Sequence, residues 1–464
     1  MQIEFHGADK NVTGSCHLVR CNGTQLLVDC GMYQGGADFD EENRGDFGFD
    51  PAAIDYLLLT HAHLDHCGRI PLLVKRGFRG KIVCTPATRE LARLVMLDSA
   101  RLQEDDAEYK MKKAGRRGNK TEVAAEPLYN TLDALNSLDY FTDITGFGNP
   151  HPLADGISVT FHDAGHILGS AAIAMDLQEN GQSRRLLFSG DLGYSGRAIV
   201  RDPAPPPEAD IVVMETTYGD RLHKKLLPSV EELYDAINTT LKRGGNVLIP
   251  SFALERAQEI LYHLREGVEQ GALPQAMPVF LDSPMAISAT QIFSRHPECF
   301  DEETFQIFKS GQDPFALPGL RFTRETAESM AINNFRGGAV IIAGSGMCTG
   351  GRIRHHLKHN LWRKEASVIF VGFAAQGTLA RRIIDGEETV RIFGDEISVR
   401  ARIHTIGGFS AHADQKELLD WHRQTGRPAT TFLVHGEEKI MATFAGLLPD
   451  TRVVMPDLHQ VHDI

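Results

Sequence analysis

The sequence predicts an α/β protein. Short apolar runs typical of buried strands alternate with longer stretches of helical periodicity along the whole chain. Side chains that commonly bind metal ions follow several of the strand-like runs. The length of 464 residues is enough for two or three domains of ordinary size.

The predicted strands share a high content of Val, Ile, Leu and Phe. They cover residues 25–29, 56–59, 81–84, 157–161, 185–188, 211–214, 246–249, 339–342, 367–370 and 432–434. Helical stretches cover residues 88–113, 229–242, 255–266 and 416–424. Ser229 and Glu232 have the spacing of a capping box, which predicts that the second helix begins at Ser229. The Pro-rich residues 202–207 predict a stiff segment near a domain junction.

The composition is that of a soluble globular protein, with 42% hydrophobic and 23% charged residues. No apolar stretch approaches the roughly 18 residues that a membrane span needs. The first residues lack the basic region and apolar core of a signal peptide. The seven cysteines are scattered and form no Cys-x-x-Cys pair. We therefore expect a cytoplasmic protein with reduced thiols and no membrane partner.

The formal net charge of −13 argues against a protein that coats nucleic acid electrostatically. It does not exclude a nucleic-acid enzyme with a local basic cleft. Residues 110–120 and the helix start at residues 352–359 are basic despite the acidic total. For the first stretch we favour a solvated helix end and loop over RNA contact. For the second stretch, a solvated face and an RNA contact are equally supported.

A dense group of metal-ligand side chains follows the strand predicted at residues 56–59. Three histidines and a carboxylate (His61, His63, Asp65 and His66) lie within six residues. Four candidate ligands can serve more than one ion, which points to hydrolysis at a two-metal site. Cys67 lies next to this group, and we interpret it as a small buried thiol.

Further candidate ligands lie near the ends of other predicted strands. His166, Asp191 and His435 each follow or approach an apolar run and have glycine close by. Glycine lets the backbone come close to a bound ion. Taken together with the cluster at residues 61–66, these residues predict a metal centre.

The pattern resembles the metallo-β-lactamase superfamily, and it is most similar to the β-CASP ribonucleases of that superfamily, over essentially the whole chain. The resemblance implies an αββα sandwich with an inserted α/β cap. It divides the chain into residues 1–215 and 404–464 for the sandwich and residues 216–403 for the β-CASP domain. It also implies a ligand set, with Asp191 bridging two ions. The first site comprises His61, His63, His166 and Asp191, and the second comprises Asp65, His66, Asp191 and His435.

The same resemblance implies roles for residues around the ligands. Asp29 orients a ligand loop, which fits the general need to fix ligand geometry. Two Zn²⁺ ions suit the imidazole and carboxylate ligands, and Mn²⁺ would also fit. Glu215 pairs with His412, which protonates the leaving oxygen of a phosphodiester. Asp65 accepts a proton from the nucleophile. RNA-acting members carry a histidine at the position of His435, whereas DNA-acting members tend to carry valine.

Three loops resemble the lining of an RNA-binding cleft, at residues 250–259, 344–352 and 372–381. Glycine-rich turns that lead into a helix offer backbone N–H groups to anions. From these loops we predict phosphate binding by Ser345, Gly346, Arg352 and Thr378. Taken without the resemblance, the same loops are tight structural turns.

The predicted activity is hydrolysis of single-stranded RNA in RNA processing or decay, as an endonuclease, a 5′-exonuclease or both. A small-molecule hydrolase such as a thioesterase or lactonase is the first alternative, but it has no use for the long insertion between Glu215 and His412. A DNA nuclease and an inactive scaffold subunit are further alternatives. We expect no separate RNA-binding domain, so specificity comes from the cleft or a partner. A homodimer and an RNA-processing partner are both compatible with the sequence.

Overall fold

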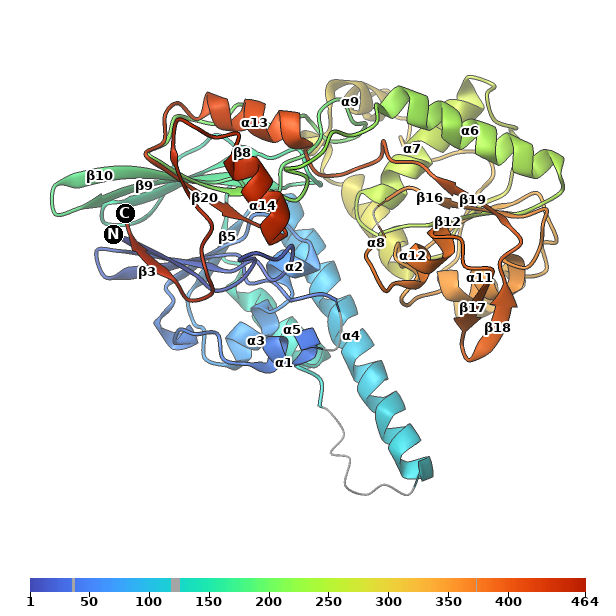
Figure 1. The fold of residues 1–464 in the computed structure, drawn as a ribbon, viewed down its shortest axis with the longest axis horizontal. Coiled ribbons are helices and arrows are strands. Elements are labelled where there is room, and N and C mark those ends of the chain that lie inside the picture. Colours follow the sequence, from blue (N-terminus) through green and yellow to red (C-terminus); the bar gives the residue numbers. More distant parts are fainter. Residues whose placement is uncertain (36–37, 118–125, 373) are drawn as a thin grey trace. The chain divides into compact units, whose positions relative to one another are not determined.

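The computed structural model describes residues 1–35, 38–117, 126–372 and 374–464 (Figure 1). The chain divides into two compact units. The first unit comprises Met1–Ser195, Asp202–Leu222 and His412–Ile464, and the second comprises Gly196–Arg201 and His223–Ala411. The second unit is thus an insertion into the first. The domain boundaries predicted after residues 215 and 403 stay a prediction.

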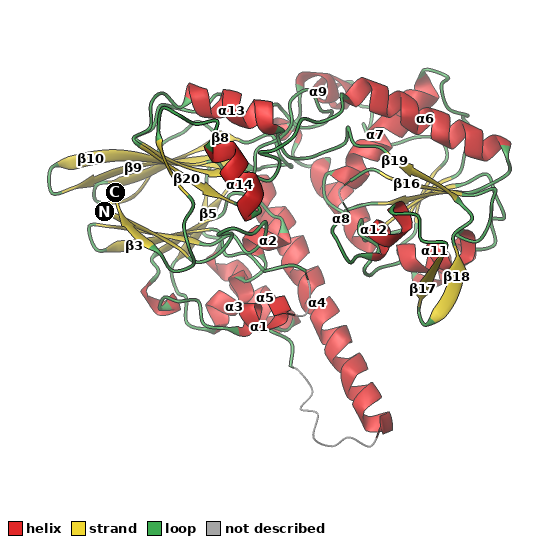
Figure 2. Ribbon diagram, viewed as in Figure 1, coloured by secondary structure: helices red, strands yellow, loops and turns green. Residues whose placement is uncertain are grey.

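Within the described residues, the first unit is a sandwich of two seven-stranded sheets (Figure 2). The first sheet contains, in spatial order, β22 (Val461–Asp463), β1 (Gln2–Phe5), β2 (His17–Cys21), β3 (Thr24–Val28), β4 (Tyr56–Leu58), β5 (Lys81–Cys84) and β6 (Asp143–Ile144). The second contains β21 (Arg452–Val454), β20 (Thr430–Val434), β11 (Ile211–Glu215), β10 (Gln182–Phe188), β9 (Ala171–Glu179), β8 (Ile157–Asp163) and β7 (His151–Ala154). The strands from β3 to β6 are parallel, as are β10, β11, β20 and β21.

Both sheets contribute side chains to one apolar core between them. Phe5, Phe161 and Phe432 are buried there, and each buried aromatic side chain contributes roughly 1.5–3 kcal/mol to stability. The helices cover the outer faces, with α13 and α14 beside the second sheet and α1, α3 and α5 beside the first (Figure 2). The helices are α1 (Asp38–Arg44), α2 (Leu64–Cys67), α3 (Ile70–Lys75), α4 (Pro86–Arg117), α5 (Thr131–Ser137), α13 (Gln415–Gln424) and α14 (Glu438–Ala445), with short 3-10 turns at Pro51–Ala53 and Leu138–Tyr140.

The second unit has a parallel six-stranded sheet and a separate two-stranded hairpin. The sheet order is β14 (Leu320–Phe322), β13 (Val279–Leu281), β15 (Val340–Ala343), β12 (Val247–Pro250), β16 (Ser367–Phe370) and β19 (Arg402–Thr405). The hairpin pairs β17 (Thr389–Ile392) with β18 (Asp395–Ser398). The helices are α6 (Leu226–Lys242), α7 (Arg256–Glu269), α8 (Pro284–Phe293), α9 (Glu302–Lys309), α10 (Thr326–Ile332), α11 (Ile353–Asn360) and α12 (Leu379–Ile384), and a 3-10 turn covers Pro297–Cys299.

The predicted elements agree with the structure in type but not in every boundary. Each predicted strand run falls on a strand, and the predicted helices fall on α4, α6, α7 and α13. The capping box predicted at Ser229 is wrong, because α6 begins at Leu226 with Lys225 as its N-cap. Ser229 is buried, and its hydroxyl donates to the Lys225 carbonyl oxygen. Pro228 is tolerated because a residue in the first helical turn needs no backbone N–H bond.

Two of the sequence predictions fall partly outside the described residues. Residues 110–117 of the first basic stretch belong to α4, whereas residues 118–120 lie outside the described chain. Phe373, in the predicted loop at residues 372–381, lies outside it as well. In the described chain, no helix has both the length and the apolar character needed to cross a membrane.

Candidate metal centre

The predicted ligands lie where strands of both sheets in the first unit end. They follow β4, β8, β10 and β20 and comprise His61, His63, Asp65, His66, His166, Asp191 and His435. The carboxyl ends of parallel strands meet at one edge of a sheet, so β10 and β20 bring their following residues together there. The short helix α2 begins directly after His63 and adds Asp65 and His66. The fold therefore gathers ligand-type residues that are far apart in the sequence.

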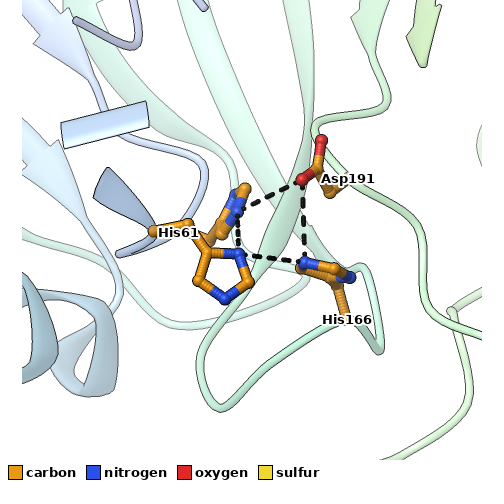
Figure 3. Close-up of side chains that lie close together, drawn as sticks. His61, His166 and Asp191 are labelled. Carbon is orange, nitrogen blue, oxygen red and sulfur yellow. Dashed lines mark hydrogen bonds and ion pairs between the residues drawn. The ribbon is translucent and has the colours of Figure 1, made fainter. Parts of the chain in front are cut away.

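The first group contains His61, His63, His166 and Asp191. Figure 3 shows His61, His166 and Asp191 pointing toward one another. His63 Nδ1 lies 3.1 Å from His61 Nε2 and 3.2 Å from His166 Nε2. Asp191 Oδ2 lies 3.4 Å from His61 Nε2 and 3.6 Å from His166 Nε2. Ligands at zinc distances of about 2.0–2.1 Å are separated by about 3.3–3.4 Å along the edges of a tetrahedron, so this group fits such an ion.

The second group contains Asp65, His66 and His435. His66 Nε2 lies 3.3 Å from His435 Nε2, and Asp65 Oδ2 lies 3.5 Å from the same nitrogen. Asp191 joins this group too, because its Oδ2 lies 3.4 Å from His66 Nε2. These distances are again close to those between neighbouring ligands of a tetrahedral zinc ion. The structure thus places all seven predicted ligands in two adjacent groups that share Asp191.

The charge states of two of these side chains, Asp191 and His61, also fit a cation. Oδ1 of Asp191 is buried, and within the described residues it accepts no hydrogen bond. Burial would raise the pKa of Asp191, but His435, His66 and His61 outweigh it and hold that pKa well below its usual value. Burial lowers the pKa of His61 well below its usual value, so its imidazole is neutral at pH 7. A neutral imidazole and an ionised carboxylate are the forms that bind metal.

Asp29 contacts one of the predicted ligands, His66. Its Oδ2 lies 2.7 Å from His66 Nδ1. Because a carboxylate only accepts, Nδ1 carries the hydrogen, and Nε2 presents its lone pair to the centre. The backbone N–H and the hydroxyl of Thr60 also donate to Asp29, at 2.8 Å and 3.0 Å for Oδ1. Asp29 thereby ties the end of β3 to the ligand loop after β4.

Sequence reasoning missed several residues that support the ligands. Thr60 Oγ1 lies 3.1 Å from His61 Nδ1, and Thr217 Oγ1 lies 3.1 Å from His435 Nδ1. A Cβ on Gly31 would lie 1.6 Å from the Asp65 carbonyl oxygen, so only glycine fits this approach. Because Thr60 directly precedes His61 in the sequence, its contact with that histidine could have been predicted. Thr217 carried no such signal, because its contact depends on the pairing of β11 with β20.

Glu215 and His412 form a carboxylate–imidazole pair next to the shared Asp191. The two oxygens of Glu215 lie 3.3 Å and 3.2 Å from His412 Nδ1, and Asp191 Oδ2 lies 4.0 Å from it. Glu215 is buried at the end of β11, where it also accepts the Leu192 N–H at 2.6 Å. Burial lowers the pKa of His412, but Glu215 and Asp191 outweigh it and raise that pKa to about 9. His412 is therefore an imidazolium at neutral pH and can give up a proton.

The four residues predicted to bind phosphate all lie in the second unit, in loops and a helix start that also have structural contacts. Arg352 donates to Asp282 Oδ1 at 2.8 Å, to the Thr323 carbonyl at 3.0 Å and to the Arg324 carbonyl at 2.6 Å. Thr378 caps α12 by accepting the Arg381 N–H. Ser345 and Gly346 lie in the loop between β15 and α11. A substrate role for these four residues stays a prediction.

The chain belongs to the metallo-β-lactamase superfamily, whose family model matches residues 10–242. A Beta-Casp domain matches residues 257–383. A Zn-dependent metallo-hydrolase RNA specificity domain matches residues 396–456. The sandwich, the inserted parallel α/β unit and the ligand groups fit this membership.

Similar proteins include a ribonuclease from Thermus thermophilus, TTHA0252, which is 41% identical over 448 residues and covers 97% of this chain and 96% of its own. The transcription termination factor FttA of Methanosarcina mazei is 32% identical over 464 residues, covering 96% of this chain and 68% of its own. A crystal structure of an Enterococcus faecalis protein of unknown function aligns with a TM-score of 0.52 over 99% of both chains. At 12% identity, that likeness concerns the fold alone.

Proposed function

We propose that this protein is a metal-dependent ribonuclease that hydrolyses phosphodiester bonds of single-stranded RNA. The observation that carries the proposal is the position of the Glu215–His412 pair, with His412 Nδ1 only 4.0 Å from the carboxylate that the two ligand groups share. A site that combines metal-binding side chains with a protonated acid suits phosphodiester hydrolysis, in which the leaving alkoxide needs a proton.

Two divalent ions, zinc in our proposal, would be held by the two ligand groups. Bound there, they would polarise phosphoryl oxygens and lower the pKa of water. Asp191 reaches both groups through its Oδ2. Asp29 and Thr60 hold the ligand loop, and Thr217 holds His435. Imidazole and carboxylate ligands suit zinc, and Mn²⁺ would fit the same set.

His412 is the proposed general acid. The carboxylate of Glu215 accepts from Nδ1, so the imidazolium transfers its proton from Nε2 to the leaving oxygen. Glu215 keeps His412 protonated and restricts its ring to one orientation. The His166 ring packs against the His412 ring, with centroids 4.4 Å apart and an interplanar angle of 50°, and restricts it further.

Asp65 is the proposed proton acceptor. Burial would raise its pKa, but a hydrogen bond from His435 and the nearby histidines hold that pKa below its usual value. The carboxylate is therefore ionised before the reaction begins. Its Oδ2 lies 3.5 Å from His435 Nε2, within the second ligand group.

Three observations support RNA as the substrate. The chain carries the RNA specificity domain of zinc-dependent metallo-hydrolases. The Thermus thermophilus relative is named a ribonuclease. His435, which the resemblance associates with RNA-acting members, lies in the second ligand group. The expected cytoplasmic location, the homodimer and the protein partner stay predictions.

The test combines metal analysis with cleavage of one RNA labelled separately at its 5′ and 3′ ends. The variant His412→Ala should keep two metal ions per chain and lose roughly 10²–10⁴-fold in cleavage rate. His151→Ala, a histidine of β7 outside the ligand groups, is the control and should cleave normally. Loss of metal together with cleavage in His412→Ala would instead make His412 a ligand. Absence of any RNA cleavage by the metal-loaded protein would refute the proposal, and the labelled products separate internal from terminal cleavage.

A further inference from the structure

The second unit carries a strongly basic stretch in an acidic protein. Residues 352–364 contain five Lys or Arg, three His, one Trp and no acidic residue, whereas the whole chain has a net charge of −13. Most of this stretch forms α11 (Ile353–Asn360). The proposed reaction uses none of the side chains on the outer face of this helix.

One face of α11 is aromatic and exposed. His355 and His359, which lie one turn apart on α11, are exposed, and so is Trp362, two residues beyond the end of the helix. Trp362 is 53% exposed, which is unusual for the largest apolar side chain. The opposite face is buried, where His356 Nε2 lies 2.6 Å from Asp282.

A strained aromatic residue, Phe393, lies beside His355. Phe393 and Gly394 connect β17 to β18, and both have positive φ angles, of 54° and 90°. Such two-residue turns favour Asn or Gly at the position of Phe393, and a bulky side chain there is strained. Phe393 is 46% exposed, so burial of its ring does not repay that strain. Backbone strain in a half-exposed residue is grounds for a functional hypothesis.

The Phe393 ring meets the basic helix directly. The Arg354 guanidinium lies 4.4 Å from the ring centroid, and the His355 ring centroid lies 4.4 Å away with an interplanar angle of 30°. Phe393, Arg354 and His355 thus form a partly stacked set of flat groups at the protein surface.

The cations on this face are only partly neutralised. Lys358 pairs with Asp395 at 2.5 Å. Within the described residues, Arg354 pairs with no carboxylate, and its Nε makes no hydrogen bond. Burial lowers the pKa of His355, and so do His356, His359 and Arg354, as expected where the local potential is positive.

We propose that this surface binds single-stranded RNA, with bases stacked on the aromatic rings and phosphates on the cations. We call it the α11 face and define it by Arg354, His355, Lys358, His359, Trp362 and Phe393. The proposal rests on the proposed function, which makes RNA the polyanion that this protein handles. Exposed aromatic rings interleaved with cations are the usual platform for single-stranded nucleic acid, because every base can stack and every nucleotide carries a phosphate. The α11 face would hold a part of the RNA that the metal ligands do not contact.

Tryptophan fluorescence offers a direct test. The chain has two tryptophans, Trp362 at 53% exposure and Trp421 at 6%. In a His412→Ala background, which prevents cleavage, a uridine homopolymer should quench the emission saturably, and the affinity should fall with added salt. The same titration of Trp362→Phe, which keeps only Trp421, should show little quenching. Equal quenching in both proteins would overturn the proposal.

Affinity measurements with surface variants provide a second test. Trp362→Ala and Phe393→Asn should each weaken binding of the homopolymer by about 5- to 150-fold, the change that corresponds to about 1–3 kcal/mol per stacked base. Asparagine suits the positive φ angle, so Phe393→Asn keeps the turn and removes only the ring. Leu227→Ala, at 77% exposure in the same unit, is the matched control and should bind normally.

The outcomes separate this proposal from the proposed function. If the protein cleaves RNA but Trp362→Ala and Phe393→Asn bind the homopolymer normally, the α11 face is not an RNA site and the ribonuclease proposal stands. If the homopolymer quenches Trp362 but the metal-loaded protein cleaves no RNA, the ribonuclease proposal fails and the RNA site stands. A change in Trp362 emission with protein concentration and without RNA would assign the face to contact between copies of the chain, and would overturn the proposal.

Discussion

Replacing Glu215 with Gln removes the charge that keeps His412 protonated while preserving the size of the side chain. Glu215 lies 3.2 Å from His412 Nδ1, and the pKa of His412 is raised from 6.5 to about 9. This difference corresponds to about 3 kcal/mol of preference for the imidazolium. The amide oxygen of glutamine can still accept the Leu192 N–H that Glu215 now accepts at 2.6 Å, so the local fold is retained.

The consequence is a shift in the pH dependence of cleavage. A general acid must be protonated, so activity falls as pH rises through the pKa of His412. At pH 7.5 the imidazolium fraction is about 97% for a pKa of 9 and about 10% for a pKa of 6.5. Glu215→Gln should therefore lose about 10-fold or more in kcat at pH 7.5 and regain part of it at pH 6.

The assay is kcat for RNA cleavage from pH 5.5 to 10, with metal content checked at each end. Bound metal ions would lower the pKa of His412 in both proteins, so the quantity measured is the distance in pH between the alkaline limbs of the two pH profiles. We expect the limb of Glu215→Gln to lie about 2.5 pH units below that of the wild type. Glu208→Gln, an exposed acid of the same unit, is the control. If the variant has a reduced kcat but its alkaline limb coincides with that of the wild type, the role of Glu215 in the protonation of His412 is refuted.

Two further predictions concern metal affinity and stability. Asp29→Asn should weaken metal binding roughly 10- to 100-fold in competition with a chelator, because an amide no longer selects the Nδ1–H tautomer of His66; unchanged affinity would contradict this role. Asp282→Asn should lower the free energy of unfolding by about 3 kcal/mol in urea at pH 7, because Asp282 is buried and pairs with Arg352 and His356. Despite the opposing effect of burial, hydrogen bonds from His356, Ser329 and Thr323 lower the Asp282 pKa to about 2. Its contribution is present above pH 3.8 and is lost as pH falls toward 2, so stability in that range should fall less in the variant than in the wild type.

The candidate metal centre could be predicted from the sequence because its residue types are uncommon and recur near strand ends. A histidine or carboxylate within three residues of the end of an apolar strand recurs at His61, Asp191 and His435. Parallel pairing then brings strand ends together without further information from the sequence. The contacts of the Thr60 and Thr217 hydroxyls with histidines of the site were not predicted, because threonine is common and its partner depends on how the strands pair.

Arg352, in the second unit, is another residue whose contacts could not be predicted from the sequence. Its place after a glycine-rich loop predicted phosphate contact. The structure directs its guanidinium to Asp282, a residue 70 positions away, and to two backbone carbonyl oxygens. Neither the acid nor the carbonyls can be identified from the local pattern. The start of α6 was misplaced for a similar reason, because the buried Ser229 hydroxyl bonds to a carbonyl of its own helix.

Asp191 makes the parts of the site depend on one another. Its Oδ2 lies within 3.6 Å of His61, His66 and His166, which belong to both ligand groups. The same oxygen lies 4.0 Å from His412 Nδ1, and that negative charge favours the imidazolium. A metal ion held by Asp191 would offset part of this charge and so lower the pKa of His412. If His412 is the proton donor that we propose, metal binding would tune it through this one carboxylate.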